Sequence, residues 1–292
     1  MTIVAAVQMV SSADRDRNLA DAARLLREAR DRGARVAALP ENFAFMGAAD
    51  HDKFAIAEDD GEGPIQAFLA TTARELGIWI VGGTVPLRVP GQSRVAAASL
   101  VFDAEGRRVA RYDKIHLFDV AVPGRDERYQ ESSTVQPGAQ PVCVDTPAGR
   151  LGLAVCYDVR FPELFRRLLS MGAEWFCLPS AFTAPTGRAH WETLLRARAI
   201  ENLCHVVAPA QSGFHEYGRE TYGDSMIVDC WGRVIGRLPR GTGVVLGTST
   251  SVASERSGRI SLPWIIEDCK TEKHEIRHTA RALRSAALAR GA

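Results

Sequence analysis

The stretch GLAVCYDVRFPELFRRLLSMG, residues 152–172, joins an apolar run to a helical pattern. Residues 151–155 have the apolar character of a buried strand, and Pro162 precedes apolar residues at helical spacing. Cys156 stands where the predicted strand ends, a place at which α/β proteins gather ligands and at which backbone N–H groups can face an anion. Taken alone, a cysteine here is more often a core residue than a nucleophile.

Strand and helix patterns alternate on both sides of this stretch. Upstream, the sequence predicts strands over residues 2–10, 34–40 and 77–86, helices over 19–29 and 65–76, and hairpins over 96–114 and 141–156. Downstream, it predicts helices over 162–171 and 190–202, strands over 173–180 and 204–211, and a hairpin over 225–238. Such βαβ units mixed with hairpins indicate an α/β fold whose mixed sheets are covered by helices. We expect one domain over residues 1–270 and a C-terminal tail over 271–292 that could form a helix.

The composition excludes several classes of protein. The 36 basic and 35 acidic residues leave a formal charge of +1, which argues against nucleic-acid or membrane partners. No apolar run has the length or the flanks of a membrane span or signal peptide, so we expect a cytoplasmic protein. The six cysteines show neither zinc-ligand nor disulfide spacing. The glycines in VGGTV and RGTGVVLG match no nucleotide-binding motif, so neither metal nor organic cofactor is expected.

Two further strand ends carry reactive side chains. LPENF, residues 39–43, places Glu41 just beyond one strand, and RYDKIHLFDV, residues 111–120, places Lys114 at the end of another. A carboxylate, an amine and the Cys156 thiol at three strand ends are what a thiol amidase requires. His116 offers an alternative base for a Cys-His hydrolase, but we expect the chain after Lys114 to direct it elsewhere.

These motifs resemble the nitrilase superfamily of carbon–nitrogen hydrolases. LPENF, YDKIHLFDV and GLAVCYDVRFPE carry the resemblance, which covers roughly residues 2–263. HLFDVAVPG, YQES, PSAFTAPTGRAHWETLLRARAIEN and YGDSMIVDCWG are most similar to the branch that holds omega-amidase and deaminated glutathione amidase. The resemblance implies a four-layer αββα sandwich that forms a homodimer or a larger homo-oligomer.

The resemblance also assigns roles to individual residues. It implies a Glu41, Lys114 and Cys156 catalytic set, supported by Glu131 as a second glutamate that keeps the lysine charged and aimed. We expect the Lys114 ammonium and the backbone N–H of Tyr157 to stabilise the oxyanion. The resemblance places Phe182 and Thr183 beside the acyl group of the substrate. Asp158 and Arg160, next to the thiol, could hold the turn by a charge-assisted hydrogen bond or reach a substrate carboxylate, and we favour the first role.

The predicted reaction is hydrolysis of a terminal carboxamide of a small carboxylic acid, with a thioester intermediate and release of ammonia. Deaminated glutathione is the first choice of substrate. The alternatives are an omega-amidase acting on α-ketoglutaramate or α-ketosuccinamate, a nitrilase or N-carbamoyl amidohydrolase, and a catalytically silent scaffold. Two departures from the family pattern stand out: Asp224 in YGDS replaces a usual histidine, and WIIEDCKTEK follows Pro263 in place of the usual basic ending. The first departure puts the identity of the substrate in question.

Overall fold

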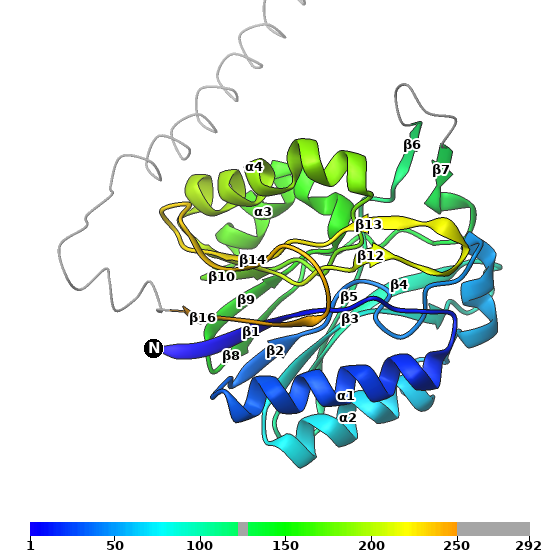
Figure 1. Cartoon of the computed structure of the whole chain (residues 1–292), viewed down its shortest axis with the longest axis horizontal. Helices are drawn as coiled ribbons and strands as arrows, with labels where there is room; N and C mark the ends of the chain where they lie inside the picture. The colour runs from blue at the N-terminus through cyan, green and yellow to red at the C-terminus, as the bar shows by residue number, and fades with distance from the viewer. Residues whose placement is uncertain (122–127, 250–292) are drawn as a thin grey trace, which may run out of the picture. The chain divides into compact units, whose positions relative to one another are not determined.

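The fold consists of two six-stranded sheets with a pair of helices on each outer face (Figure 1). The computed structural model describes residues 1–121 and 128–249. The predicted domain end at residue 270, the tail over 271–292 and the unusual ending after Pro263 lie outside the described residues. Within the described residues the order of layers is helices, sheet, sheet, helices, which confirms the predicted αββα sandwich.

The first sheet has the order β16-β1-β2-β3-β4-β5. Its strands are β1 (Thr2–Gln8), β2 (Val36–Ala38), β3 (Trp79–Arg88), β4 (Val95–Phe102), β5 (Arg108–Asp113) and β16 (Gly243–Ser249). Pairing among β1, β2 and β3 is parallel, whereas β16, β4 and β5 join antiparallel. The predicted mixed character of the sheet is therefore confirmed. β16, which pairs with β1 along its whole length, was not predicted.

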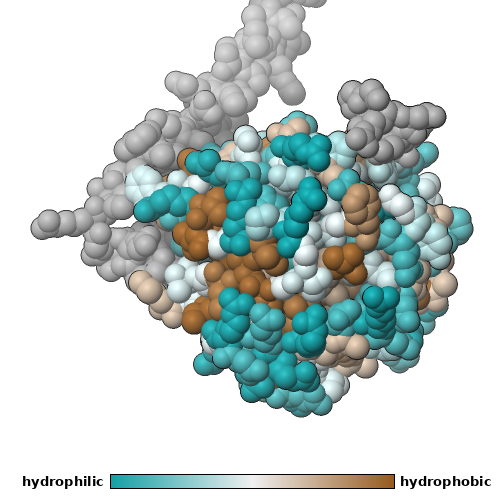
Figure 2. All heavy atoms as spheres, in the orientation of Figure 1, coloured by the Kyte–Doolittle hydropathy of each residue, from teal (hydrophilic) through white to brown (hydrophobic). Residues whose placement is uncertain are grey.

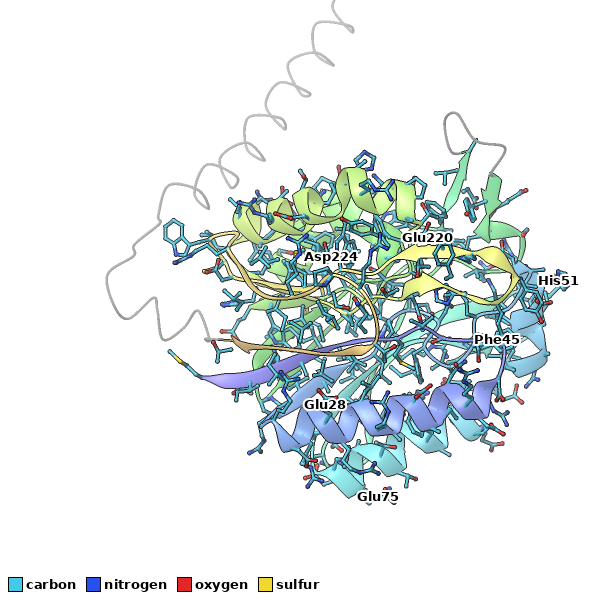
Figure 3. All side chains as sticks on the ribbon, in the orientation of Figure 1. Glu28, Phe45, His51, Glu75, Glu220 and Asp224 are labelled. Atoms are coloured by element: carbon cyan, nitrogen blue, oxygen red, sulfur yellow. The ribbon has the colours of Figure 1, made fainter. Side chains whose placement is uncertain are left out.

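The helices α1 (Arg15–Asp31) and α2 (Pro64–Leu76) cover the outer face of this sheet. Asp14 caps α1, because its carboxylate accepts a hydrogen bond from the Arg17 N–H at 3.0 Å. The buried face of α1 consists of residues three and four apart, namely Asn18, Ala22, Leu25, Leu26 and Ala29. Glu28 and Glu75 lie on the opposite, solvent-facing sides of these helices (Figure 3).

The second sheet has the order β15-β14-β11-β10-β9-β8. Its strands are β8 (Cys143–Thr146), β9 (Gly149–Leu153), β10 (Trp175–Cys177), β11 (His205–Ala208), β14 (Ser225–Val228) and β15 (Val234–Leu238). The helices α3 (Pro162–Ser170) and α4 (Ala184–Asn202) cover its outer face. The predicted hairpins β4–β5, β8–β9 and β14–β15 are all confirmed.

The central strands are apolar on both faces because each face is covered. In β1, Val4 and Ala6 pack toward the second sheet, whereas Ala5 and Val7 pack toward the helices. This period of two within a continuously apolar strand is what a sheet buried on both sides produces. In the space-filling view, the layer with α1 presents mostly hydrophilic side chains, and hydrophobic residues gather between that layer and α4 (Figure 2). Among the described helices, none combines the length and apolar character that crossing a bilayer would demand.

Short elements beyond the two sheets surround one end of the sandwich. They are the hairpins β6 (Asp119–Ala121) with β7 (Arg128–Gln130) and β12 (Ser212–Phe214) with β13 (Glu220–Tyr222), and the 3₁₀ turns η1 (Asp50–Ile56), η2 (Glu131–Ser133), η3 (Cys156–Arg160) and η4 (Glu216–Gly218). The sequence patterns did not predict them. Segments this short show too few residues for a period of 2 or 3.6 to emerge.

Candidate active site

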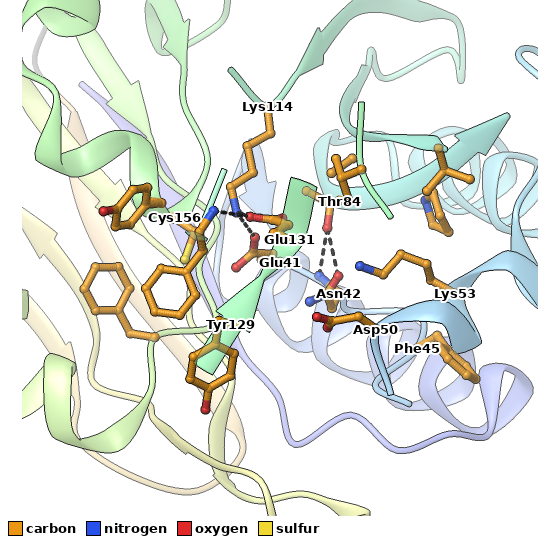
Figure 4. A pocket seen from close by; sticks show the side chains of 18 of the residues that line it. Glu41, Asn42, Phe45, Asp50, Lys53, Thr84, Lys114, Tyr129, Glu131 and Cys156 are labelled. Atoms are coloured by element: carbon orange, nitrogen blue, oxygen red, sulfur yellow. Dashed lines mark hydrogen bonds and ion pairs between the residues drawn. The ribbon is translucent and has the colours of Figure 1, made fainter. Parts of the chain in front are cut away.

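The side chains predicted for the site meet in one pocket. Glu41, Lys114 and Cys156 follow three different strands, β2, β5 and β9, at the end of the sandwich where these strands finish. Figure 4 shows them side by side, with Glu131 next to Lys114. The same pocket is lined by the other residues that the family resemblance indicated, namely Tyr157, Phe182 and Thr183.

Glu41 is held by its backbone rather than by a regular element. The preceding segment continues the pairing of β2, because the Leu39 N–H donates to the Val81 carbonyl at 2.9 Å. Gly83 in β3 permits this approach, since a Cβ there would lie 2.1 Å from the Pro40 carbonyl oxygen. The Gln211 side chain donates to the Glu41 carbonyl at 3.1 Å, and the Glu41 side chain is buried. These contacts fix the backbone from which the Glu41 carboxylate enters the pocket.

Lys114 is fully buried and contacts three carboxylate oxygens. Its Nζ lies 2.9 Å from Glu41 Oε1 and 3.0 and 2.9 Å from the two oxygens of Glu131. Burial alone would lower the pKa of the ammonium, but the charges of Glu131 and Glu41 outweigh it and raise the pKa well above its usual range. Lys114 therefore stays protonated, and its three N–H donors are all engaged.

Glu131 is positioned by the β6–β7 hairpin. Asp119 of β6 pairs with Gln130 of β7, which brings Glu131 back to Phe118. The Phe118 N–H donates to Glu131 Oε2 at 2.7 Å. Burial pushes the pKa of the Glu131 carboxyl upward, but the Lys114 charge, its hydrogen bonds and the Phe118 N–H together bring the pKa below its ordinary value. Glu131 is thus a carboxylate that balances Lys114.

Cys156 begins η3 in a left-handed backbone conformation, with φ of 49°. Such a conformation costs about 1–2 kcal/mol for a residue other than glycine. Two contacts fix it: the Cys156 N–H donates to the Pro179 carbonyl at 3.0 Å, and Asp158 Oδ2 accepts from the Val155 N–H at 2.8 Å. Backbone strain at a thiol inside a pocket is a feature of functional sites.

The thiol of Cys156 is neutral at rest. Burial raises its pKa well above the ordinary value, and the nearby Glu41 charge raises it further. Lys114 and a hydrogen bond from the Ala181 N–H act in the opposite direction but do not prevail. Because two carboxylates already balance the lysine, a nucleophilic attack by this thiol would require a base that takes its proton.

The other predicted residues occupy distinct places. The Tyr157 N–H donates to no acceptor among residues 1–121 and 128–249, so it is available to an oxyanion. Asp158 holds the turn as expected, accepting from the Tyr112 hydroxyl at 2.7 Å and the His116 N–H at 3.0 Å. Arg160 does not pair with Asp158. Its guanidinium lies 5.6 Å from the ring centres of both Tyr157 and Phe182 and so packs on two walls of the pocket.

His116 does not line the pocket. Its Nδ1 lies 2.7 Å from Asp158 Oδ1, and its ring stacks on Phe161 with centroids 3.7 Å apart. The imidazole is therefore part of the support beneath the thiol turn. This placement favours the carboxylate Glu41 over the Cys-His alternative.

Asp224 also lies outside the pocket. Its carboxylate is buried and binds Arg237 in a bidentate ion pair at 2.7 and 2.8 Å. Figure 3 shows Asp224 well separated from Phe45, which lines the pocket. The link to the site is indirect: the Trp191 indole donates to the Asp224 carbonyl at 2.8 Å and packs 4.9 Å from Phe182. The departure from the family pattern therefore concerns a support of the pocket wall.

The sequence patterns missed several residues that line the same pocket. Lys53 and Asp50 come from η1, Asn42 follows Glu41, Thr84 lies in β3, and Arg219 precedes β13. Asn42 follows a predicted strand directly after Glu41, but its neutral amide indicated no catalytic role, and the other four do not sit at the end of a predicted strand. Within residues 1–121 and 128–249, no cluster of three or more His, Cys, Asp or Glu side chains has an arrangement suited to a metal ion.

Comparison with known proteins gives consistent matches. A family model described as carbon-nitrogen hydrolase matches residues 3–255. A deaminated glutathione amidase of Yersinia enterocolitica is 44% identical over 81% of this chain and 82% of its own length. The crystal structure of the Caenorhabditis elegans NitFhit protein superposes with a TM-score of 0.79 at 38% identity, over 88% of this chain and 63% of that chain.

A second solved structure bears on the thiol. It is a glutamate-to-glutamine mutant of the amidase from Nesterenkonia sp. AN1 that shows Michael addition of acrylamide at its active site cysteine. It superposes with a TM-score of 0.73 at 25% identity, over 88% of this chain and 97% of that chain. The structural matches confirm the nitrilase-like fold that the sequence motifs predicted.

Proposed function

Since this chain belongs to the carbon–nitrogen hydrolase family, we propose that it is an amidase whose nucleophile is Cys156 and whose base is Glu41. The observation that carries the proposal is the convergence of a buried thiol, a carboxylate and a doubly paired ammonium in one pocket. A family member that served only as a scaffold would have no use for a buried charge cluster beside a strained cysteine.

The first chemical step follows from the charges. As Sγ of Cys156 attacks the amide carbon, Glu41 accepts the thiol proton and loses its negative charge. The substrate oxygen gains that charge, so the Lys114 N–H that had bonded Glu41 turns to the oxyanion, while Glu131 keeps the ammonium in place. The Tyr157 N–H supplies a second donor, and each good donor of this kind is worth about 3 kcal/mol.

The second half of the reaction reuses the same groups. Glu41 returns its proton to the departing nitrogen, which leaves as a neutral amine or ammonia, and the acyl group remains on Cys156 as a thioester. Water deprotonated by Glu41 then attacks the thioester carbon. The carboxylic acid is released, and the thiol regains its proton.

We propose deaminated glutathione as the substrate, because relatives named deaminated glutathione amidase are 40 to 44% identical to this chain over most of its length. Deaminated glutathione has no terminal carboxamide, so hydrolysis of the amide bond on its acyl chain releases a dipeptide with a free amine. The predicted release of ammonia applies to the alternative, an omega-amidase acting on α-ketoglutaramate. Both substrates present an amide on an acyl chain that ends in a carboxylate, so the nature of the released amine distinguishes them.

The test measures released amine and ammonia with deaminated glutathione and with α-ketoglutaramate. We expect the wild-type protein to cleave at least one of them and Cys156→Ala to lose about 10⁴-fold or more in kcat. Cys177→Ala is the matched control, because Cys177 is a buried cysteine of β10 outside the pocket. A Cys156→Ala protein as active as the wild type would refute the nucleophile, and a wild type inactive on both compounds would refute the substrate class.

A further inference from the structure

The pocket holds a second lysine that the proposed reaction does not use. Lys53 lies in η1 and is half-buried, and in Figure 4 its side chain extends into the pocket from a different side than Lys114. Its Nζ donates to the neutral Thr134 hydroxyl at 3.2 Å. Among residues 1–121 and 128–249, no carboxylate forms an ion pair with it. A partly desolvated ammonium without a counter-ion is available to an anionic ligand.

The direction of the Lys53 pKa shift agrees with the absence of a paired carboxylate in the described part of the chain. Burial lowers the pKa of Lys53, and the positive charge of Lys114 lowers it further. The negative charges of Asp50, Glu131 and Glu41 raise the pKa but do not offset the burial. Asp50 is exposed to solvent, so water screens much of its charge. The net effect is a pKa below the ordinary lysine value. An anion bound at this ammonium would supply the missing favourable charge.

Two further residues of the pocket have donors that are unpaired within the described residues, and one of them, Asn42, lies beside Lys53 (Figure 4). Asn42 accepts from the Thr84 hydroxyl through Oδ1 at 3.2 Å, which leaves its amide N–H groups without an acceptor in the part of the chain that the structure describes. Arg219 lines the pocket with its guanidinium 5.8 Å from the Tyr129 ring centre, and its buried Nε has no hydrogen-bond partner there. The pocket therefore offers donors in addition to Lys53 that an anionic ligand can use.

The pocket is therefore electrically asymmetric. Three carboxylates and three cations line it. At the thiol end, Glu41 and Glu131 surround the single Lys114, which leaves a charge of −1. At the other end, the half-buried Lys53 lies beside Asp50, an exposed carboxylate whose charge is screened by water (Figure 4). A substrate that carries a carboxylate is repelled from the first end and attracted to the second.

We propose that Lys53 binds the carboxylate of the substrate's acyl group, and that this contact makes the enzyme selective for amides of dicarboxylic acids and turns the amide toward Cys156. The inference rests on the proposed amidase function and names its substrate class. Both candidate substrates carry this acyl-chain carboxylate, and it remains in the pocket in the thioester. The hydrogen bond to Thr134, whose hydroxyl in turn donates to the Glu131 carbonyl at 3.3 Å, holds the Lys53 ammonium close to the residue that pairs with Lys114.

The first test compares two amides that differ only at the far end: glutaramate, which ends in a carboxylate, and pentanamide, which ends in a methyl group. We expect Lys53→Met to lower the ratio of their kcat/KM values about 10- to 100-fold, mainly through KM for glutaramate. Lys53→Arg keeps the charge and should restore much of the ratio. Arg27→Met, an exposed change on α1, is the matched control and should leave the ratio unchanged.

An unchanged ratio in Lys53→Met would overturn the assignment. So would a fall of the ratio that appears only in Arg219→Gln, because the carboxylate would then lie at the arginine.

A second readout does not need turnover. We expect glutarate to bind the Cys156→Ala protein in calorimetry, and to bind at least about tenfold more weakly when Lys53→Met is added. Equal affinity in both proteins, or no binding in either, would overturn the assignment. Should the wild type hydrolyse neither amide while glutarate binding still depends on Lys53, the proposed function would fail and the carboxylate site would stand.

Discussion

The two lysines of the pocket share a cavity but not an environment. Lys114 is fully buried and contacts three carboxylate oxygens, and its pKa is raised. Lys53 is half-buried and contacts one hydroxyl, and its pKa is lowered. Burial opposes the charge of both, so the difference lies in the partners that the chain supplies. Protein carboxylates already balance the charge of Lys114, which suits a residue of the reaction site. Lys53 has no such counter-ion among the described residues and can bind an anionic ligand.

The largest difference should appear when each lysine is replaced by methionine. Lys114→Met leaves two buried carboxylates facing each other, so we expect the free energy of unfolding to fall by about 3–5 kcal/mol. We expect amidase activity to fall by about 10⁴-fold. A lysine whose pKa is lower in the folded state destabilises the fold while it is charged. Lys53→Met should therefore change stability by less than about 1 kcal/mol. Urea unfolding of both variants measures this, and equal losses would contradict the comparison.

Replacing Glu41 by glutamine should separate activity from thiol acidity. We expect Glu41→Gln to lower kcat about 10²- to 10⁴-fold, because the base is lost. The same change removes a negative charge that raises the pKa of Cys156, so the thiol should ionise at lower pH than in the wild type. The pH dependence of iodoacetamide labelling at Cys156 measures the second effect. A thiol pKa that rises in Glu41→Gln would show that the carboxylate does not act on the sulfur.

The smallest effect concerns alkaline pH. Because its folded-state pKa is lowered, Lys53 is charged at lower pH and loses its proton before an ordinary lysine, whose pKa is about 10.4. Lys114, with a raised pKa, keeps its proton throughout. We expect kcat/KM for glutaramate to fall several-fold more than that for pentanamide as the pH rises toward 10. Parallel profiles for the two amides, or a difference that persists in Lys53→Met, would argue against the ammonium of Lys53.

The sequence patterns indicated Lys114 and its partners as site residues but did not indicate Lys53. The predicted residues each follow an apolar strand, namely Glu41, Lys114 and Cys156. Apolar strands can be predicted from the short-range pattern of hydrophobic residues. Lys53 lies in a seven-residue 3₁₀ turn that has no buried residue of its own, so nothing nearby marks it as part of a site. Only the folded pocket brings η1 beside Thr134, 81 residues further along the chain.

The core of the fold was predictable for a similar reason, and the elements that the sequence patterns missed were missed for physical reasons. The βαβ units and hairpins of the core follow from apolar runs that are buried on both faces. β16 reads as a glycine-rich loop because its strand character comes from pairing with β1. α4 begins at Ala184, before the predicted start at residue 190, because Pro185 falls in its first turn, where a missing N–H costs nothing. The Ala181 N–H beside the sulfur carries no sequence signal, since every residue has one.

Peptide mapping after rapid acid quench of a turnover mixture would identify the nucleophile. With glutaramate as substrate, we expect a glutaryl thioester on the peptide that contains Cys156, formed by the wild type and absent from Cys156→Ala. An acyl group on another residue, or continued turnover by Cys156→Ala, would rule out Cys156 as the nucleophile.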